Sequence, residues 1–527
     1  MRRRDVLKLG GAALATIAAP RVGHADRAKP LVFVPSSDLT VLDPVVTFNR
    51  PTRNYSYLVF DTLYGLDANW TAQPQMVEGH AVENDGLVWN LTLRDGLYFH
   101  DREPVLARDV VASIRRFAAR ISFAGALMAA TDELSAPDDR TVRFRLNKRF
   151  PHLPDALAGP GGTVPAIMPE RLASESPFKP VKEAVGSGPY RFLADEHISG
   201  ARAAFERFAK YRPRDGQRGF TSGPKIAHFE RVEWVTLDQF SAMAALVRGE
   251  IDWWESPPRD LVDQVARDRN VTAVSHFATA MGILRFNQLY PPFDNPAIRR
   301  AVIGAIDQGE AMTGVAGTDP QNWRDGIGLF GHGTPLANEV GVEAMRGPRD
   351  YPAVKEALKR AGYNGEKIVI ISPTEVAGIR DLSKIGAEQL RRAGLNIDFQ
   401  EMDFGTVVRR RTSQGPPDKG GWNIFFTLID RSIPNTTPYG NQAIRADGKK
   451  GWDGWPDSPR IEGLRAAWLD AAGLDEQRRI AADLQKQMWE DTPFIPMGEY
   501  WQATAYRKGL TEVMPGCFCT FYGVRRA

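Results

Sequence analysis

Cysteine is nearly absent from this sequence, which has only Cys517 and Cys519 among 527 residues. A disulfide between positions two apart is strained, so we expect no disulfide framework and a fold that is stabilised by its hydrophobic core. Histidine is also scarce: of the eight histidines, none of those after residue 25 stand at a metal-ligand spacing such as i and i+4. The sequence therefore predicts no metal site, and nothing in it indicates a cofactor.

A long hydrophobic run and an excess of one charge are both missing. The formal net charge is +3, and residues 1–25 hold five basic residues and one acidic residue, so the remainder carries −1. A chain this close to neutral has no basic face that would bind nucleic acid. The uncharged stretch at 9–19 is shorter than the roughly 20 apolar residues that a membrane-spanning helix needs, so we expect no membrane anchor.

The first 25 residues are typical of a secretory signal. Arginines at positions 2–4 precede the uncharged stretch, and residues 23–25 place small side chains where a signal peptidase reads. The arginine pair, followed by an apolar residue and by Leu-Lys, indicates a twin-arginine signal. We predict that the signal is residues 1–25 and that the mature protein is in the periplasm.

Catalytic motifs are present only as incomplete strings. Residues 326–331 fit G-x-G-x-x-G, but no apolar strand precedes them and Pro335 follows where a helix would have to begin, so they do not predict a nucleotide site. Residues 176–179 fit S-x-x-K without its companion motifs, as a proline-rich turn does. We predict that the chain is not an enzyme.

Short strands and amphipathic helices alternate along the chain. Apolar residues alternate at 89–93 and 142–146, and a helical stripe at 110–117 lies between them, which predicts an α+β section. After residue 295 single helices separate the strands, which predicts a parallel sheet. The expected elements there are helices at 296–306, 352–361, 382–390 and 480–488 and strands at 368–371 and 395–399, with Gly309 just past the first helix. The Gly- and Pro-rich segment 211–224 is expected to be a surface excursion.

An ordered set of motifs runs through nearly the whole chain. The longest is Leu-Arg-Asp-Gly-Leu-Tyr-Phe-His-Asp at 93–101, and Gly-Ser-Gly-Pro-Tyr follows at 186–190. The others are at 42–44, 59–64, 249–252, 286–287, 292–294 and 299–307. This set resembles the periplasmic solute-binding proteins of ABC importers, in the family of dipeptide, oligopeptide and nickel binders. The chain departs from the family pattern at Leu106, where a helix-capping residue is usual, and at Thr427, where the family has tryptophan.

The resemblance implies an α/β fold with two lobes, which is the type II periplasmic-binding-protein fold of peptide binders, with an extra α+β domain inserted in the first lobe. Lobe 1 would comprise residues 26–65, 186–278 and 497–527, the inserted domain residues 66–185, and lobe 2 residues 279–496. The two strands that cross between the lobes should lie near 279–287 and 493–501. Closure of the lobes about these strands would enclose the ligand.

The resemblance also implies a function: capture of a peptide or peptide-like solute by a monomer and its delivery to ABC permease subunits in the inner membrane. A nickel chelate, an opine or a sugar is the alternative ligand, and an exported hydrolase or a sensor subunit is the alternative from another class. We expect Asp430 to accept an ammonium group and Arg411 to bind a carboxylate through its planar guanidinium.

Five further residues are candidate contacts. Ser37 and Asp38 precede the Leu-Asp-Pro motif and should line the first lobe. Tyr500 and Trp501, at the second crossing, should supply aromatic walls. Trp422 is included, although a tryptophan at such a position is more often part of the core.

Overall fold

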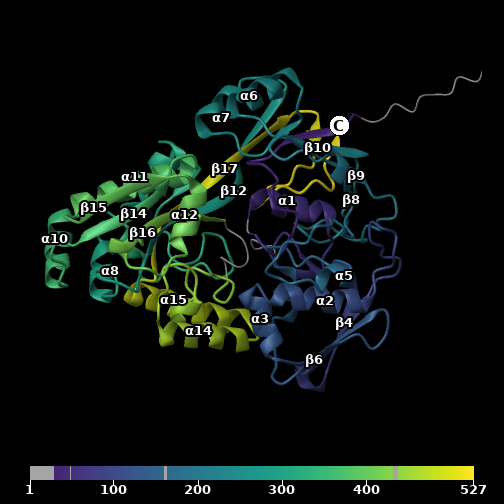
Figure 1. Cartoon of the computed structure of the whole chain (residues 1–527), viewed down its shortest axis with the longest axis horizontal. Coiled ribbons are helices and arrows are strands. Elements are labelled where there is room, and N and C mark those ends of the chain that lie inside the picture. Colours follow the sequence, from purple (N-terminus) through teal and green to yellow (C-terminus); the bar gives the residue numbers. More distant parts are fainter. Residues whose placement is uncertain (1–28, 48, 160–162, 431–436) are drawn as a thin grey trace, which may run out of the picture.

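The structure is a computed structural model that describes residues 29–527 apart from 48, 160–162 and 431–436. The predicted signal at 1–25 lies outside these residues. Two long antiparallel strands, β12 (Val271–Phe286) and β17 (Phe494–Arg507), run from one half of the molecule into the other (Figure 1). They belong to one sheet with the order β15-β14-β16-β12-β17-β11-β1-β10-β9-β8, with β13 (Trp323–Arg324) added beside β17.

The first lobe is the half that contains β1. Its strands are β1 (Leu31–Val34), β8 (Tyr190–Phe192), β9 (Arg202–Arg207), β10 (Arg231–Val235) and β11 (Trp253–Trp254), and its helices are α1 (Arg50–Val59), α6 (Gln239–Arg248) and α7 (Arg259–Val265). The ring of Phe33 lies 4.9–5.3 Å, between centroids, from the rings of Trp234, Trp253 and Phe521. Because these rings come from three distant parts of the chain, near residues 33, 234–253 and 521, the core of this lobe forms only when all three meet.

A separate four-stranded sheet with the order β4-β5-β7-β6 lies beside the first lobe. Its strands are β4 (Val77–Glu83), β5 (Val88–Leu93), β6 (Thr131–Ser135) and β7 (Thr141–Leu146), and the helices near it are α2 (Ala107–Ala118), α3 (Ser122–Ala129), α4 (Leu153–Ala158) and α5 (Glu170–Ala173). All of these elements fall within 66–185, the segment predicted to be inserted. Leu106 begins α2 without a side-chain cap, and Asp109 accepts a hydrogen bond from the Leu106 backbone N–H (2.9 Å) in compensation.

The second lobe has the predicted parallel strands. β14 (Lys367–Pro373) pairs parallel with both β15 (Asn396–Met402) and β16 (Ile424–Asp430). The helices are α8 (Pro296–Ile303), α9 (Gln308–Ala316), α10 (Tyr351–Arg360), α11 (Ala377–Arg392), α12 (Phe404–Arg411), α14 (Pro459–Asp470) and α15 (Leu474–Asp491). Gly362 and Gly394 follow α10 and α11 with φ of 96° and 90°, so the predicted helix ends are confirmed. Short pairs β2 (Tyr64–Leu66) with β3 (Ala72–Pro74), and β18 (Leu510–Thr511) with β19 (Arg525–Arg526), lie outside the large sheet.

One predicted helix is wrong in its extent. Asn295 caps α8 as predicted, accepting a hydrogen bond from the Ala297 N–H, but α8 ends at Ile303. Asp307 then caps α9 by accepting from the Glu310 N–H at 2.9 Å, so Gly309 lies inside a second helix. A strong cap in the middle of an apolar stripe therefore divided one expected helix into two.

The segment 211–224 is also not a simple surface excursion. Residues 219–223 are buried, and next to them the Lys225 ammonium lies 2.7 Å from Asp61 Oδ1, with both side chains at most 1% exposed. Asp61 also accepts from the Tyr211 hydroxyl at 2.9 Å. The segment therefore fixes part of the core of the first lobe.

No helix among the described residues has both the length and the apolar character of a membrane-spanning segment.

Helix α11 packs closely on β16 because of one glycine. A Cβ on Gly386 would lie 2.2 Å from Cε1 of the buried Phe426 ring. We expect Gly386→Ala to lower the free energy of unfolding by about 1–2 kcal/mol, since overpacking outweighs the gain in helix propensity. Gly463 in α14 has no atom within 4 Å of its Cβ position, so Gly463→Ala should stabilise by about 0.5–1 kcal/mol. Urea denaturation of the two variants checks this, and equal effects would contradict it.

Candidate ligand-binding site between the lobes

A cluster of charged and amide side chains connects the lobes where they meet. Arg50, Arg53 and Asn54 occupy positions i, i+3 and i+4 of α1, so they share one face of that helix. Asp430 ends β16 in the second lobe and pairs with Ala280 of β12. The interlobe cluster, as we call it, consists of Arg50, Arg53, Asn54, Glu255, Asp430 and Gln502.

Asp430 binds both arginines. The Arg50 Nη2 donates to Asp430 Oδ1 at 2.9 Å, and the Arg53 Nη2 donates to Asp430 Oδ2. Burial alone would raise the pKa of Asp430, but the two guanidinium groups outweigh it and hold that pKa below its ordinary value. The same contacts raise the pKa of Arg50 against the opposing effect of its burial. Asp430 is therefore ionised and ion-paired across the lobes at neutral pH.

Glu255 supplies the second negative charge of the interlobe cluster. Its carboxylate accepts from Asn54 Nδ2 at 2.7 Å and from the Ser36 N–H at 2.6 Å, and its residue is 2% exposed. The backbone N–H of Cys519 donates to Asn54 Oδ1 at 3.1 Å. Among the described residues, the interlobe cluster thus holds two arginines and two carboxylates.

The two cysteines lie beside the interlobe cluster as buried thiols with no disulfide. Burial raises the pKa of Cys517 to about 12 and also raises the pKa of Cys519. Both are protonated at neutral pH and are poor nucleophiles. Cys517 and Phe518 also line a gap between Arg50 and Gln502 that is too narrow for a water molecule.

The crossing strand β17 brings Tyr500, Trp501 and Gln502 to this region. Gln502 Oε1 accepts from Arg50 Nη2 at 2.6 Å, and Gln502 Nε2 donates to the Tyr500 hydroxyl at 3.2 Å. Trp501 packs instead against the His276 ring, 5.0 Å away between centroids, and under the Arg324 guanidinium. Of the predicted contacts, the structure joins Tyr500 and Asp430 to one hydrogen-bonded network.

The other predicted contacts lie in different surroundings. Arg411 Nε is 3.0 Å from Asp453 Oδ2, and the indole N–H of the fully buried Trp422 donates to the Arg411 carbonyl. Asp38 accepts from the Gly200 N–H at 2.8 Å, and Ser37 is exposed. None of these contacts, among the described residues, connects the four side chains to the interlobe cluster.

Five members of the interlobe cluster were not predicted from the sequence. Arg50, Arg53 and Asn54 show a helical spacing that indicates one shared face, but the partner of the two arginines is nearly 380 positions away. Glu255 follows the Gly-Glu-Ile-Asp motif by only three residues, yet nothing local marks it as buried. Gln502 adjoins the predicted Tyr500 and Trp501 and was the member easiest to find.

A second contact between the lobes lies at the inserted domain. The His152 ring stacks on Trp468 of α14, with centroids 4.4 Å apart and an angle of 11° between the rings. Phe123 of α3 packs on the same indole, and the Gln442 amide donates to the Ser122 hydroxyl at 2.8 Å. Figure 1 shows α3 and α14 facing each other below the crossing strands. The lobes thus contact each other through the ion pairs of the interlobe cluster and through these stacked rings.

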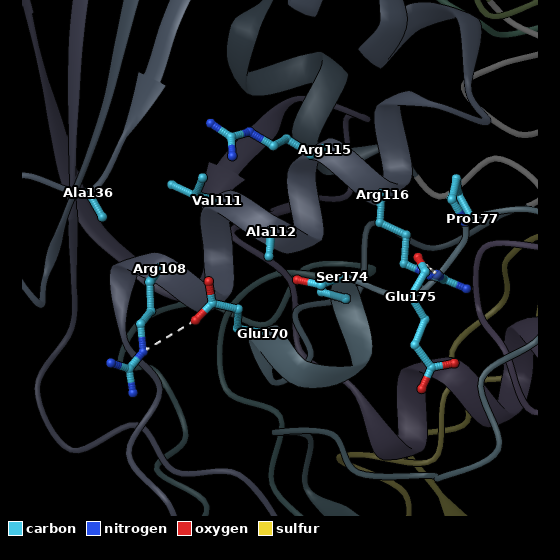
Figure 2. Close-up of a pocket in the computed structure, with 11 residues that line it drawn as sticks. Arg108, Val111, Ala112, Arg115, Arg116, Ala136, Glu170, Ser174, Glu175 and Pro177 are labelled. Atoms are coloured by element: carbon cyan, nitrogen blue, oxygen red, sulfur yellow. Dashed lines mark hydrogen bonds and ion pairs between the residues drawn. The ribbon is translucent and has the colours of Figure 1, made fainter.

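A hollow of about 410 Å³ lies between α2 and α5 (Figure 2). None of the residues that line it belongs to the interlobe cluster. Arg108 at its rim pairs with Glu170 at 3.7 Å, and the nearly unexposed Arg116 is bound to Asp43 Oδ2 at 2.6 Å. Arg108 and Arg116 are therefore matched by carboxylates of the protein itself. No group of three or more His, Cys, Asp or Glu residues in the described part of the chain is arranged to hold a metal ion.

Comparison with known proteins identifies the family. The model of the bacterial extracellular solute-binding proteins, family 5 (middle part), matches residues 71–450. The chain belongs to this family. Its relative y4tO of Sinorhizobium fredii, a probable peptide ABC transporter periplasmic-binding protein, is 34% identical over 534 positions that cover 100% of this chain and 99% of y4tO.

Solved structures of other binding proteins share the fold of this family 5 chain. A dipeptide-binding protein from Pseudoalteromonas in complex with Met-Leu gives a TM-score of 0.77 at 17% identity and covers 95% of this chain and 100% of its own. The binding protein AgaA of A. tumefaciens in complex with agropinic acid gives 0.78 at 19% identity, with 95% and 99% covered. The predicted family and the predicted two-lobed type II fold are confirmed.

Proposed function

We propose that this family 5 protein is the substrate-binding component of an ABC import system. It captures a peptide or peptide-like solute between its lobes as a monomer and delivers it to permease subunits in the inner membrane. The name of y4tO supports a peptide ligand. The proposal includes export by a twin-arginine signal at residues 1–25 to the periplasm, and release of the solute chemically unchanged.

The interlobe cluster is the observation that supports this proposal most. Its members come from α1, the segment after β11, the end of β16 and the crossing strand β17, so their geometry depends on how the lobes sit. Ligand-driven closure about two crossing strands would bring these groups together around a bound solute. Tyr500, Trp501 and the more distant Arg411, Trp422, Ser37 and Asp38 remain proposed contacts.

A thermal-shift screen of the mature chain against peptides, opines, nickel chelates and sugars tests the function. A true ligand at 100 times its dissociation constant should stabilise the protein by about 2.7 kcal/mol. Solution scattering should show a smaller radius of gyration with that ligand. Stabilisation by an opine alone, the ligand type in AgaA, would change the solute class and leave the transport role intact. A reaction product in the mixture, or no compaction with any stabilising ligand, would refute the proposal.

A further inference from the structure

The surroundings of Asp430 disfavour the binding of a solute ammonium group. Each of its two oxygens accepts a hydrogen bond from a different arginine. An ammonium group brought to the same carboxylate would lie within a few ångströms of both guanidinium groups, and like charges at that distance repel strongly in a poorly hydrated site.

We propose that Arg50 and Arg53, with the Gln502 amide, form the receptor for an oxyanion of the solute, and that the Asp430 carboxylate occupies this receptor until the solute's acidic group replaces it. This inference rests on the proposed function. The inference implies that the solute is an acid, and that its binding near Asp430 does not depend on a free ammonium group. Asp430 is then an internal competitor.

The donors of the two arginines fit this role. The Arg53 side chain is 1% exposed, and its Nε has no hydrogen-bond acceptor among the described residues. A buried guanidinium N–H without an acceptor is costly, and Arg53 reaches Asp430 only through Nη2. A planar oxyanion that bound Nε and Nη2 side by side would satisfy both donors, as a bidentate carboxylate does.

The rest of the receptor is preorganised by the first lobe and the crossing strand. Ser256 Oγ accepts from Arg50 Nη1 at 3.3 Å, and Gln502 Oε1 accepts from its Nη2. The Cys517 carbonyl accepts from Arg53 Nη2 at 3.3 Å. These contacts lie outside the second lobe's β16, so they keep both guanidinium groups in position when Asp430 moves away with that strand.

The exposure of the partners favours exchange at Asp430. Its side chain is 23% exposed, compared with 16% for Arg50 and 1% for Arg53. Asp430 can therefore be rehydrated after it is displaced, whereas the arginines need an anion in place. Because a tethered competitor acts at an effective concentration of roughly millimolar, its removal should tighten the binding of an acidic solute.

Three dipeptide probes separate the two roles of Asp430 by calorimetric titration of the mature chain. N-acetyl-Ala-Glu has carboxylates and no ammonium, Ala-Gln amide has an ammonium and no carboxylate, and Ala-Glu has both. We expect N-acetyl-Ala-Glu to bind to the unmodified chain. Compared with that affinity, it should bind at least tenfold more weakly to Arg50→Gln and at least threefold more tightly to Asp430→Asn. Ala-Gln amide should not bind. Urea midpoints of the variants confirm that both fold.

Two variants outside the interlobe cluster serve as controls. Asp447→Asn changes another carboxylate of the second lobe that an arginine holds, Arg445 at 2.6 Å, and Arg191→Gln changes an exposed arginine of the first lobe. Both should bind N-acetyl-Ala-Glu as the unmodified chain does.

Either of two results overturns the inference. The first is tighter binding of Ala-Gln amide than of N-acetyl-Ala-Glu, with loss of binding in Asp430→Asn, since Asp430 would then be the ammonium site. The second is no binding of any carboxylate probe at 10 mM. If Ala-Gln amide binds and compacts the chain in scattering, the proposed transport function stands while the acidic-solute inference fails. If no compound of the thermal-shift screen binds either, the function fails as well.

Discussion

Replacing Lys225 by methionine is expected to lower the free energy of unfolding of the first lobe by about 3–5 kcal/mol. The Lys225 ammonium is the charge partner of Asp61, and both side chains are at most 1% exposed. Its loss leaves a carboxylate buried with only neutral donors, the Tyr211 hydroxyl at 2.9 Å and the Thr62 N–H. Urea denaturation followed by tryptophan fluorescence at pH 7 measures the change.

The loss of stability in Lys225→Met should depend on pH, and the pKa of Asp61 fixes the direction of that dependence. Burial would raise the pKa of Asp61, but Lys225 and the hydrogen bonds hold that pKa below its ordinary value. The stabilisation by Asp61 is therefore complete above about pH 4 and is lost as the pH falls through the lower folded pKa. Without Lys225 burial dominates and raises that pKa, so the deficit of the variant should shrink from pH 7 to pH 5. The double variant Asp61→Asn with Lys225→Met should recover part of the loss, and no recovery would contradict an ion-pair origin.

Trp468→Ala should weaken solute binding at least tenfold, in addition to lowering the free energy of unfolding by about 3 kcal/mol. The indole is 3% exposed and its contacts include His152 and Phe123, which lie in the segment predicted as the inserted domain. Its removal takes away one of the contacts that hold the lobes together, so the closed form becomes less populated and the apparent affinity falls. Scattering should show a larger radius of gyration.

A matched variant separates closure from stability. Trp489 lies in the same lobe on α15, is half-buried, and donates to the Val340 carbonyl within that lobe. Trp489→Ala should lower stability and leave the affinity nearly unchanged. An equal loss of affinity in both variants would show that the effect of Trp468 is general destabilisation.

Much of the fold was predictable because local signals coincide with it. The stripe in α11 and the glycine after it fixed a helix to within a few residues, and Ile397 and Phe399 fall within the strand that follows. The prediction failed at Gly309, where two helices share one apolar face and only the cap at Asp307 separates them. The apolar periodicity does not reveal the break between the two helices, since the stripe continues across it.

The site was less predictable than the fold. Asp430 and Tyr500 were found through the family's motifs and the position of the second crossing, and both belong to one network. Arg53 and Glu255 were not found, because burial and a partner hundreds of residues away give a charged side chain its role, and neither leaves a local pattern. A single sequence therefore predicts helices and strands with a periodic apolar face far better than it predicts which charged side chains form ion pairs.

The pairing of β1 has a consequence for how the chain folds. Val32 and Asp252, which are hydrogen-bonded in the first lobe, are 220 positions apart, whereas only α11 and two short turns separate β14 from β15 in the second. Contacts between distant positions form slowly, because the entropy of closing a long loop is lost before the contact stabilises anything. We therefore expect the sheet of the first lobe to form after that of the second.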